Sequence, residues 1–379
     1  MSLFTFVGCS IKDKTNEDNL SIIIDFENIE TTQEKDFFEL FQLDTLIELE
    51  FKEDFYLGDL YRVVVAEDVI YALDLNFGNL IRFTREGKVL NRIGEKGEGP
   101  EEMPEIVDFA YDRENDELIL ASYSAMRISR FKPTGEFVSS IRAQEQMDQM
   151  AFSSSNLALS MTYYNSLYRN LALISTKGDT IKTFFPFPKD VFPIMLKFIS
   201  GHLTSSIESG FLFSEPASSK IYALDSEAGI YSKYQFLAKD EFWPEEDKHL
   251  LNDFFQKLST GELSFLSRFY EETNQYLFFN INKKKSGLRP QIVDPRIGYY
   301  DPLDKAVKFS KSDESLLWIK GPIAAEGDKF YVWISKSKLN DLALENSFWE
   351  KSLLEYPNLL IKNTGDYDTP VLIRIKVVI

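Results

Sequence analysis

The chain has 379 residues, and its 42 Lys and Arg against 60 Asp and Glu give a formal net charge of −18. With 44% apolar and 27% charged residues, it has the composition of a globular protein rather than a disordered or fibrous one. No apolar run approaches the ~20 residues that a membrane-spanning helix needs. We expect no nucleic-acid partner, because an acidic chain whose longest basic stretch is Lys283 to Lys285 repels phosphate backbones. Aromatic residues, 14% of the chain, favour strands over helices.

The first residues carry the one cysteine of the chain, Cys9. An apolar run and the small residue Gly8 precede it, and a polar stretch from residue 10 to 19 follows. This arrangement resembles a bacterial lipobox, in which the cysteine thiol receives a lipid. The leader is short and has no Lys or Arg, which a start codon placed too far downstream would explain. We interpret residues 1–9 as the remnant of a truncated lipoprotein signal, with Cys9 as the lipid attachment site. The alternative is a free thiol on a ragged terminus.

Residues 10–44 alternate short apolar pieces with charges, including the stretch from Asp36 to Phe41. We predict a tether here, with at most one short helix. The folded domain is expected to span residues 45–379.

Two hairpin patterns then alternate along the chain. The first has an apolar residue, a turn with Gly near its end, and two apolar or β-branched residues. Glycine belongs in such a turn because it adopts positive φ without steric cost, and Asp or Asn tolerates that conformation. The pattern occurs five times, with the turn position filled by Gly87, Gly135, Gly178, Gly229 and, in the fifth copy, Asp304.

The second hairpin pattern joins an apolar strand, a polar turn and a strongly apolar strand, and it occurs six times. Equivalent positions lie on average 52 residues apart. Four strands in about 50 residues are typical of a propeller blade. The equivalent residues are Ile70, Leu118, Leu157, Phe211, Leu277 and Phe330.

Six copies of one hairpin and five of the other leave one blade without its outermost strand. The chain ends in an apolar strand from Thr369, which fits the third strand of the sixth blade. The unassigned strand from Thr45 to Phe51 fits the missing fourth. We therefore predict an all-β, six-bladed β-propeller with four-stranded blades, in which an N-terminal strand closes the last blade and leaves no interface unpaired.

Two segments interrupt the strand pattern. Residues 244–258 have a Pro and acidic residues at the start, an apolar face and Gly261 just past the end, which predicts a helix. A similar insertion runs from Leu339 to Glu355. Both are predicted to be small helical insertions in the propeller.

The segment 91–103, which reads N-R-I-G-E-K-G-E-G-P-E-E-M, resembles the linker G-x-x-G-x-G-P-x-E-F of six-bladed propellers of the NHL/TolB-like kind. Met103 stands where Phe is usual. Together with Leu49-Glu50, residues 58–63 and the terminal Pro370-Val-Leu, it resembles a family of six-bladed β-propeller lipoproteins of Gram-negative bacteria. The resemblance covers residues 45–379. It implies a fold and a location in the cell envelope, lipid-anchored to the outer membrane on its periplasmic or surface side, rather than an activity.

No catalytic residues are predicted. His202 and His249 are the only histidines, so a histidine-based triad or a multi-histidine metal site has little support. Oxygen ligands from several blades could hold a divalent cation such as calcium in the channel, but their convergence is not visible in a sequence. A solvated acidic surface is the alternative interpretation. The conceivable ligands are Asp108, Glu208, Asp294 and Asp301.

Aromatic residues in predicted loops are the ligand-binding candidates. Tyr163 and Tyr164 lie between strands of the third blade, and Trp243 begins the first insertion. Such rings stack on sugars or on peptide side chains, although they also cover apolar surface.

The leading hypothesis from the sequence is an envelope-anchored, monomeric propeller that binds a glycan, a peptide or a partner protein without catalysis. The alternatives are a propeller hydrolase or lyase with a divalent cation in the channel, and a structural partner in an outer-membrane assembly.

Overall fold

The computed structural model describes residues 21–378, except for residues 29–30, 54, 162, 164, 190–200, 207–209, 226–228, 239–240, 248, 261–262, 285–292, 312–315 and 360–367.

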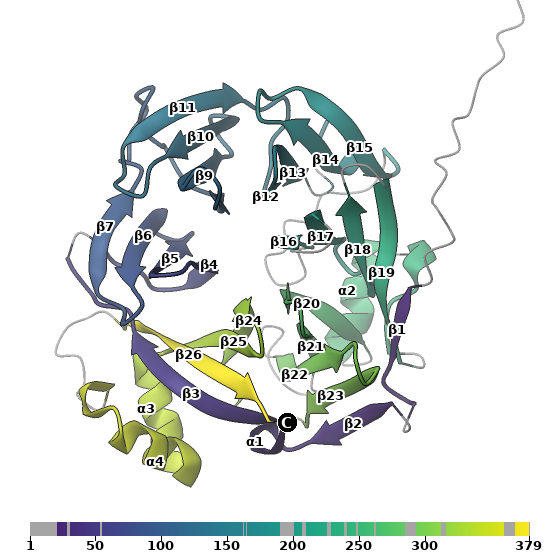
Figure 1. The fold of residues 1–379 in the computed structure, drawn as a ribbon. Coiled ribbons are helices and arrows are strands. Elements are labelled where there is room, and N and C mark those ends of the chain that lie inside the picture. Colours follow the sequence, from purple (N-terminus) through teal and green to yellow (C-terminus); the bar gives the residue numbers. More distant parts are fainter. Residues whose placement is uncertain are drawn as a thin grey trace, which may run out of the picture.

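Six β-sheets stand around a central axis, each with its first strand nearest that axis (Figure 1). The strands of each blade that follow one another in sequence pair antiparallel. The six equivalent residues chosen from the sequence all lie in second strands, which confirms the predicted propeller. The first three blades comprise β4 (Leu60–Val65), β5 (Val69–Asp74), β6 (Asn79–Thr84) and β7 (Val89–Ile93); β8 (Asp108–Asp112), β9 (Glu117–Ser122), β10 (Arg127–Phe131) and β11 (Phe137–Arg142); and β12 (Gln149–Ser153), β13 (Asn156–Ser160), β14 (Arg169–Ser175) and β15 (Thr180–Pro186).

The remaining three blades recruit strands from the N-terminal part of the chain. Blades four and five each have a fifth, outer strand, and the last blade has four strands. Their strands are β16 (His202–Ser206), β17 (Gly210–Ser214), β18 (Lys220–Asp225), β19 (Gly229–Leu237) and β1 (Ile22–Asp25); β20 (Ser264–Glu272), β21 (Leu277–Lys284), β22 (Val293–Asp301), β23 (Ala306–Ser310) and β2 (Thr32–Lys35); and β24 (Lys320–Glu326), β25 (Lys329–Ser335), β26 (Pro370–Val377) and β3 (Phe41–Glu48).

The last blade is closed as predicted. β3 pairs antiparallel with β26, so the C-terminal strand is third and the N-terminal strand is fourth in that sheet. Leu46 lies opposite Ile373, and both are buried. The strand begins at Phe41, four residues before the predicted start, and ends at Glu48.

The predicted tether differs from the structure between residues 22 and 44. β1 pairs parallel with β19, and β2 pairs parallel with β23, so both strands cover sheet edges that would otherwise be unpaired. Ile24 is fully buried against blades four and five. The short helix α1 (Phe37–Leu40) follows, within the stretch where one was expected, and leads directly into β3.

The turn that repeats between third and fourth strands has positive φ at its predicted glycines. At Gly87 the φ is +85°, and a Cβ there would overlap the carbonyl oxygen of Glu48 in the neighbouring blade. In the fifth copy the residue with positive φ is Lys305 (φ 52°) and not Asp304. The turn residue therefore lies one position later than the repeated hairpin pattern predicts. The glycine-rich segment after β7 forms the connection to β8, as predicted, with Met103 buried.

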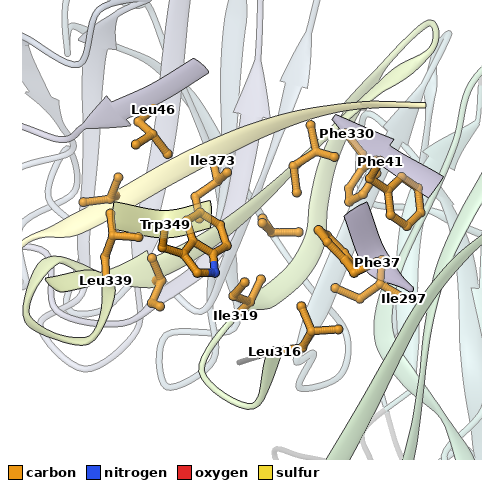
Figure 2. Packing of buried hydrophobic residues seen from close by; sticks show 14 of the residues in the cluster. Phe37, Phe41, Leu46, Ile297, Leu316, Ile319, Phe330, Leu339, Trp349 and Ile373 are labelled. Atoms are coloured by element: carbon orange, nitrogen blue, oxygen red, sulfur yellow. The ribbon is translucent and has the colours of Figure 1, made fainter. Parts of the chain in front are cut away.

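The insertions are helical, as predicted. The first contains a 3-10 turn, η1 (Glu245–Asp247), and α2 (Leu251–Thr260). The second contains α3 (Lys336–Glu345), α4 (Ser347–Leu354) and η3 (Pro357–Leu359). Leu339 and Trp349 of this second insertion join Phe37 and Phe41 in one core that also includes strands of blades five and six (Figure 2).

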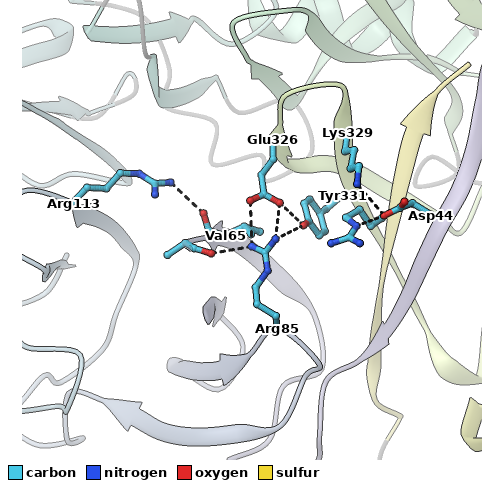
Figure 3. A network of polar contacts seen from close by, with 9 residues as sticks. Asp44, Val65, Arg85, Arg113, Glu326, Lys329 and Tyr331 are labelled. Carbon is cyan, nitrogen blue, oxygen red and sulfur yellow. Dashed lines mark hydrogen bonds and ion pairs between the residues drawn. The ribbon is translucent and has the colours of Figure 1, made fainter. Parts of the chain in front are cut away.

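The seam between the last blade and the first is tied by polar contacts (Figure 3). Arg85, which follows β6, donates to both carboxylate oxygens of Glu326 at 2.9 and 3.2 Å and to the carbonyl of Ala66 at 2.9 Å. The Tyr331 hydroxyl donates to the same carboxylate at 2.6 Å. Burial raises the pKa of Glu326, but the hydrogen bonds from Arg85 and Tyr331 outweigh it and lower the pKa below its usual value. This carboxylate therefore stays ionised and joins the two blades.

We predict that the two parts of the N-terminal segment differ in importance. Deleting residues 1–35 removes β1 and β2 from blades that keep four strands each, so the melting temperature should fall by only several degrees. Deleting residues 1–48 also removes β3, exposing β26 and opening the ring, so cooperative unfolding should be lost. Thermal unfolding followed by circular dichroism measures both, and equal melting of the two deletions would contradict the closure by β3.

Candidate ligand-binding cavity in the channel

The innermost strands of the blades surround one cavity, which we call the channel cavity. Its lining comes from β4, β12, β16, β20 and β24, while β8 contributes Asp108 behind Arg62. The free space inside is about 10 Å³ for the centre of a water-sized group, which is about one water molecule. The lining residues are Tyr61, Arg62, Gln149, His202, Arg268, Phe269, Glu271, Pro322 and Ile323.

Three neighbouring blades bulge their inner strands where the cavity lies. On β20, residues 266 and 270 pair with residues only two apart on β21, so residues 267–269 are accommodated without regular pairing. β24 has the same irregularity between Lys320 and Ala324, and β4 has an extra residue at Tyr61. Bulges redirect side chains and occur next to functional sites. The other three inner strands, β8, β12 and β16, pair without a register shift.

Arg62 and Asp108 form the structural base of the cavity. Arg62 donates through Nε and Nη2 to the two carboxylate oxygens of Asp108, with Nη2 to Oδ2 at 2.8 Å, and Nη2 also donates to the carbonyl of Leu203 at 2.9 Å. The amide of Met150 donates to Asp108 at 2.7 Å. Asp108 is fully buried, and its negative charge raises the pKa of Arg62 against the effect of burial. One ion pair thereby connects the inner strands of the first four blades.

Neutral hydrogen bonds hold the neighbouring strands. Gln149 donates to the carbonyl of Gly201 and accepts from the amide of Leu203, both at 2.7 Å. The Tyr270 hydroxyl donates to the carbonyl of His202 at 2.7 Å. The Gln149 amide is therefore occupied by backbone partners, and it positions β16 rather than offering a free group to a ligand.

Arg268 is the cation of the cavity that has no carboxylate partner among the described residues. Its guanidinium lies 4.4 Å from the ring centroid of Tyr61 and 4.8 Å from that of Phe269. Burial lowers its pKa, and the nearby Arg62 adds to that effect, while Tyr61, Asp59 and Asp108 oppose it. Arginine remains charged in proteins, so the cavity carries a positive charge that lies against two aromatic rings.

His202 and Glu271 face each other across the cavity, with His202 Nε2 3.9 Å from Glu271 Oε1. Burial raises the pKa of Glu271 to about 8, although Arg62 and the hydroxyl of Thr204 act in the opposite direction. Burial and the two arginines hold the pKa of His202 well below its usual range. At neutral pH the raised pKa favours the protonated carboxyl group and the lowered pKa favours the neutral imidazole, so neither side chain is the counter-charge of Arg268.

A second acid of raised pKa lies close by. Burial raises the pKa of Asp148, directly before β12, to about 7, with a further contribution from Asp108 and an opposing hydrogen bond from Ser160. Two acids near the channel thus titrate at or above neutral pH, which is characteristic of functional sites.

The aromatic candidates from the sequence lie away from the channel cavity. Tyr163 is buried, with the ring of Phe187 edge-on at 5.2 Å. Trp243 is buried beneath the first insertion, donates to the carbonyl of Asp247 at 2.6 Å and contacts Phe254. Tyr164 and Cys9 lie outside the described residues.

The conceivable cation ligands do not converge. Asp108 is engaged by Arg62, and Asp301 accepts amide hydrogens within its own turn. Asp294 lies in β22, whereas Glu208 lies outside the described residues. In the part of the chain that the structure describes, no group of three His, Cys, Asp or Glu side chains is placed to hold a metal ion.

Most residues of the cavity carry no site signal in the sequence. Asp108 is predicted there only as a conceivable cation ligand and His202 only as a histidine without support for catalysis, while nothing distinguishes Arg62, Arg268 or Glu271. One sequence signal could have predicted part of the cavity. Asp108, Gln149 and His202 are polar residues that each begin the first, innermost strand of a blade.

The arrangement of the six sheets shows that this protein is a six-bladed β-propeller, and its inner strands surround a cavity lined by charged residues. The model of the family described as "Domain of unknown function (DUF4934)" matches residues 21–376, and the chain belongs to this family. The match includes the two outer strands β1 and β2.

Solved structures agree on the fold. A protein of Bacteroides fragilis named a "putative exported protein" is 16% identical, with a TM-score of 0.73, covering 95% of this chain and 100% of its own. A DUF4221 member from Bacteroides vulgatus is 11% identical, with a TM-score of 0.56, covering 89% of this chain and 98% of its own. No curated protein matches the sequence. Among the described residues, no helix is long and apolar enough to cross a membrane.

We predict that the Arg62–Asp108 pair is essential for stability. Arg62→Ala leaves a buried carboxylate without its counter-charge and should lower the free energy of unfolding by about 3–5 kcal/mol at neutral pH. The loss should shrink as the pH falls, because a protonated Asp108 no longer leaves a buried charge. Urea denaturation measures both effects. Lys338→Ala, which breaks the exposed pair with Asp341, is the control and should cost about 1 kcal/mol or less. Equal losses in the two variants would show that the channel pair is not structural.

Proposed function

We propose that this protein is a monomeric binding module of the cell envelope, which holds a glycan, a peptide or a partner protein at the channel cavity without catalysing a reaction. The proposal rests mainly on one observation: the inner strands of three of the six blades have β-bulges, whereas the other three pair regularly. Three adjacent inner strands bulge at one place and deliver Tyr61, Arg268 and Phe269 together with Pro322 and Ile323. Ligand sites combine apolar walls with a few placed polar groups, which is the composition of this lining.

Location in the envelope is supported by the exported protein with the same fold and by the sequence around Cys9. The lipid anchor on Cys9 and the attachment to the outer membrane are parts of the proposal.

A second candidate function is favoured by one observation. His202 and Glu271 lie 3.9 Å apart with pKa values displaced in opposite directions, an arrangement that also serves acid–base catalysis. This would make the protein a propeller hydrolase or lyase. Turnover of an envelope compound that disappears in both His202→Ala and Glu271→Gln would replace the binding proposal with this one.

We predict that a ligand identified by a thermal-shift screen of envelope glycans, peptides and calcium binds in the channel cavity. A ligand that binds only the folded state raises the melting temperature. Phe269→Ala should weaken its binding by about 1–3 kcal/mol, because the ring forms part of the wall. Trp243→Ala should lower stability and leave the affinity unchanged. The opposite result, with affinity dependent on Trp243 and not on Phe269, would move the site to the first insertion.

We predict that the protein expressed with its natural upstream sequence is lipidated on Cys9. Labelling with a palmitate analogue should mark the wild type, which should fractionate with membranes. Cys9→Ala should carry no label and stay soluble. An unlabelled wild type would refute the anchor without touching the cavity.

A further inference from the structure

We propose that the channel cavity recognises a carboxylate at the end of an extended chain, namely the C-terminus of a peptide whose last residue is apolar, and that Arg268 contacts that carboxylate. This inference rests on the proposed function and specifies the ligand of the same cavity.

The first step is the available charge. The chain as a whole carries a net charge of −18, yet the cavity holds two guanidinium groups. Arg62 is neutralised by Asp108, whereas no described carboxylate pairs with Arg268. A cation surrounded by rings and partly removed from water attracts an anion more strongly than an exposed one does.

The second step is geometry. Tyr61 and Phe269 lie 4.4 and 4.8 Å from the guanidinium carbon of Arg268, so the rings pack against the flat group. The N–H groups of a guanidinium point outward in its plane and match the two oxygens of a carboxylate. Rings packed against the guanidinium restrict its orientation before a ligand arrives. Less side-chain conformational entropy is then lost on binding.

The third step is the size and polarity of the cavity. The free volume accommodates only about one water-sized group, so a ligand can place no more than a small polar end there, such as an oxygen of a carboxylate, while a ring cannot enter. A uronic acid carries its carboxylate directly on a sugar ring, and its hydroxyls need several free partners. The amide of Gln149 and the carboxylate of Asp108 are already occupied, whereas Pro322 and Ile323 offer apolar surface. These features favour a peptide end over an acidic glycan.

The surrounding acids make the recognition sensitive to pH. The groups that act on Glu271 or face it are Arg62 on β4 and, on β16, the hydroxyl of Thr204 and the imidazole of His202. Arg268 and Glu271 both line the channel cavity from β20. A protonated Glu271 leaves the positive charge intact and has a proton to donate. Its ionisation above a pKa of about 8 adds a negative charge to the lining of the same cavity, so affinity for a carboxylate should fall as the pH rises.

The test uses the full chain and two N-acetylated peptide libraries of the same randomised sequence, one with a free C-terminal carboxylate and the other amidated. Oligogalacturonate is the glycan arm. Peptides with an apolar last residue and a free carboxylate should bind, and their amidated twins should bind at least about tenfold more weakly. Amidated peptides that bind equally well would overturn the inference. So would binding of oligogalacturonate without any peptide, although that result would leave the proposed binding function standing.

Variants of the cavity complete the test. Arg268→Gln should weaken peptide binding at least about thirtyfold. Arg268→Lys keeps the charge but loses the paired N–H donors of the guanidinium, so its affinity should lie between those of the wild type and Arg268→Gln. The matched control is Arg113→Gln, which removes an arginine stacked on Tyr111 outside the cavity and should change nothing. Unchanged affinity in a folded Arg268→Gln protein would overturn the inference.

The pH arm uses the same peptide. Wild-type affinity should fall about tenfold between about pH 6.5 and about pH 9.5, and Glu271→Gln should abolish the fall. Asp148→Asn removes the second acid of raised pKa and serves as the control, in which the fall in affinity with pH should persist. A fall that persists in Glu271→Gln would contradict the role given to this carboxyl group. Absence of binding by every probe here and in the envelope screen would refute the inference together with the proposed function.

Discussion

The pairing of β3 with β26 is the constraint on which the other blades depend. A blade has two faces to bury, and in a ring both are covered by neighbours only if the first and last blades meet. β3 provides that contact from the N-terminal side of the chain, and Glu326 with Arg85 ties the resulting seam. Because the inner strands also contact one another around the axis, the position of each depends on this closure.

A closed ring makes local irregularity useful. β20, β24 and β4 are the edge strands of their sheets, and each also contacts the inner strands of the two neighbouring blades, so their extra residues cannot be absorbed by moving a whole strand outward or inward. They are displaced from regular pairing, and the side chains in and around these bulges line the channel cavity. The regular blades opposite contribute a fixed base, in which the side chains of Asp108 and Gln149 are hydrogen-bonded to neighbouring strands. Regular and bulged blades therefore have different roles, one structural and one available for recognition.

The fold was predictable from the sequence because its signals are local and repeated. Each turn needs positive φ near one position, and each second strand is strongly apolar, so both patterns survive low similarity between blades. β1 and β2 were missed because a four-residue strand added parallel to an edge has no period of its own. The cavity was missed for a related reason: an extra residue such as Tyr61 in a bulge looks like any other strand residue. Its members come from distant segments, and only the folded ring brings Arg62 next to Asp108 or His202 next to Glu271.

The electrostatics of the channel follow from which charges are paired. Asp108 is matched by Arg62 and by the amide of Met150, so its charge is bound to the scaffold and adds little to the field that a ligand meets. Burial favours the protonated form of Glu271 and the neutral form of His202 at neutral pH, which leaves Arg268 without a carboxylate partner among the described residues. An acidic protein thereby keeps one positive group in a narrow apolar space. Since the same burial that favours the neutral form of Glu271 also strengthens the field of Arg268, the preference for an anionic end group and its loss at alkaline pH share a single physical origin.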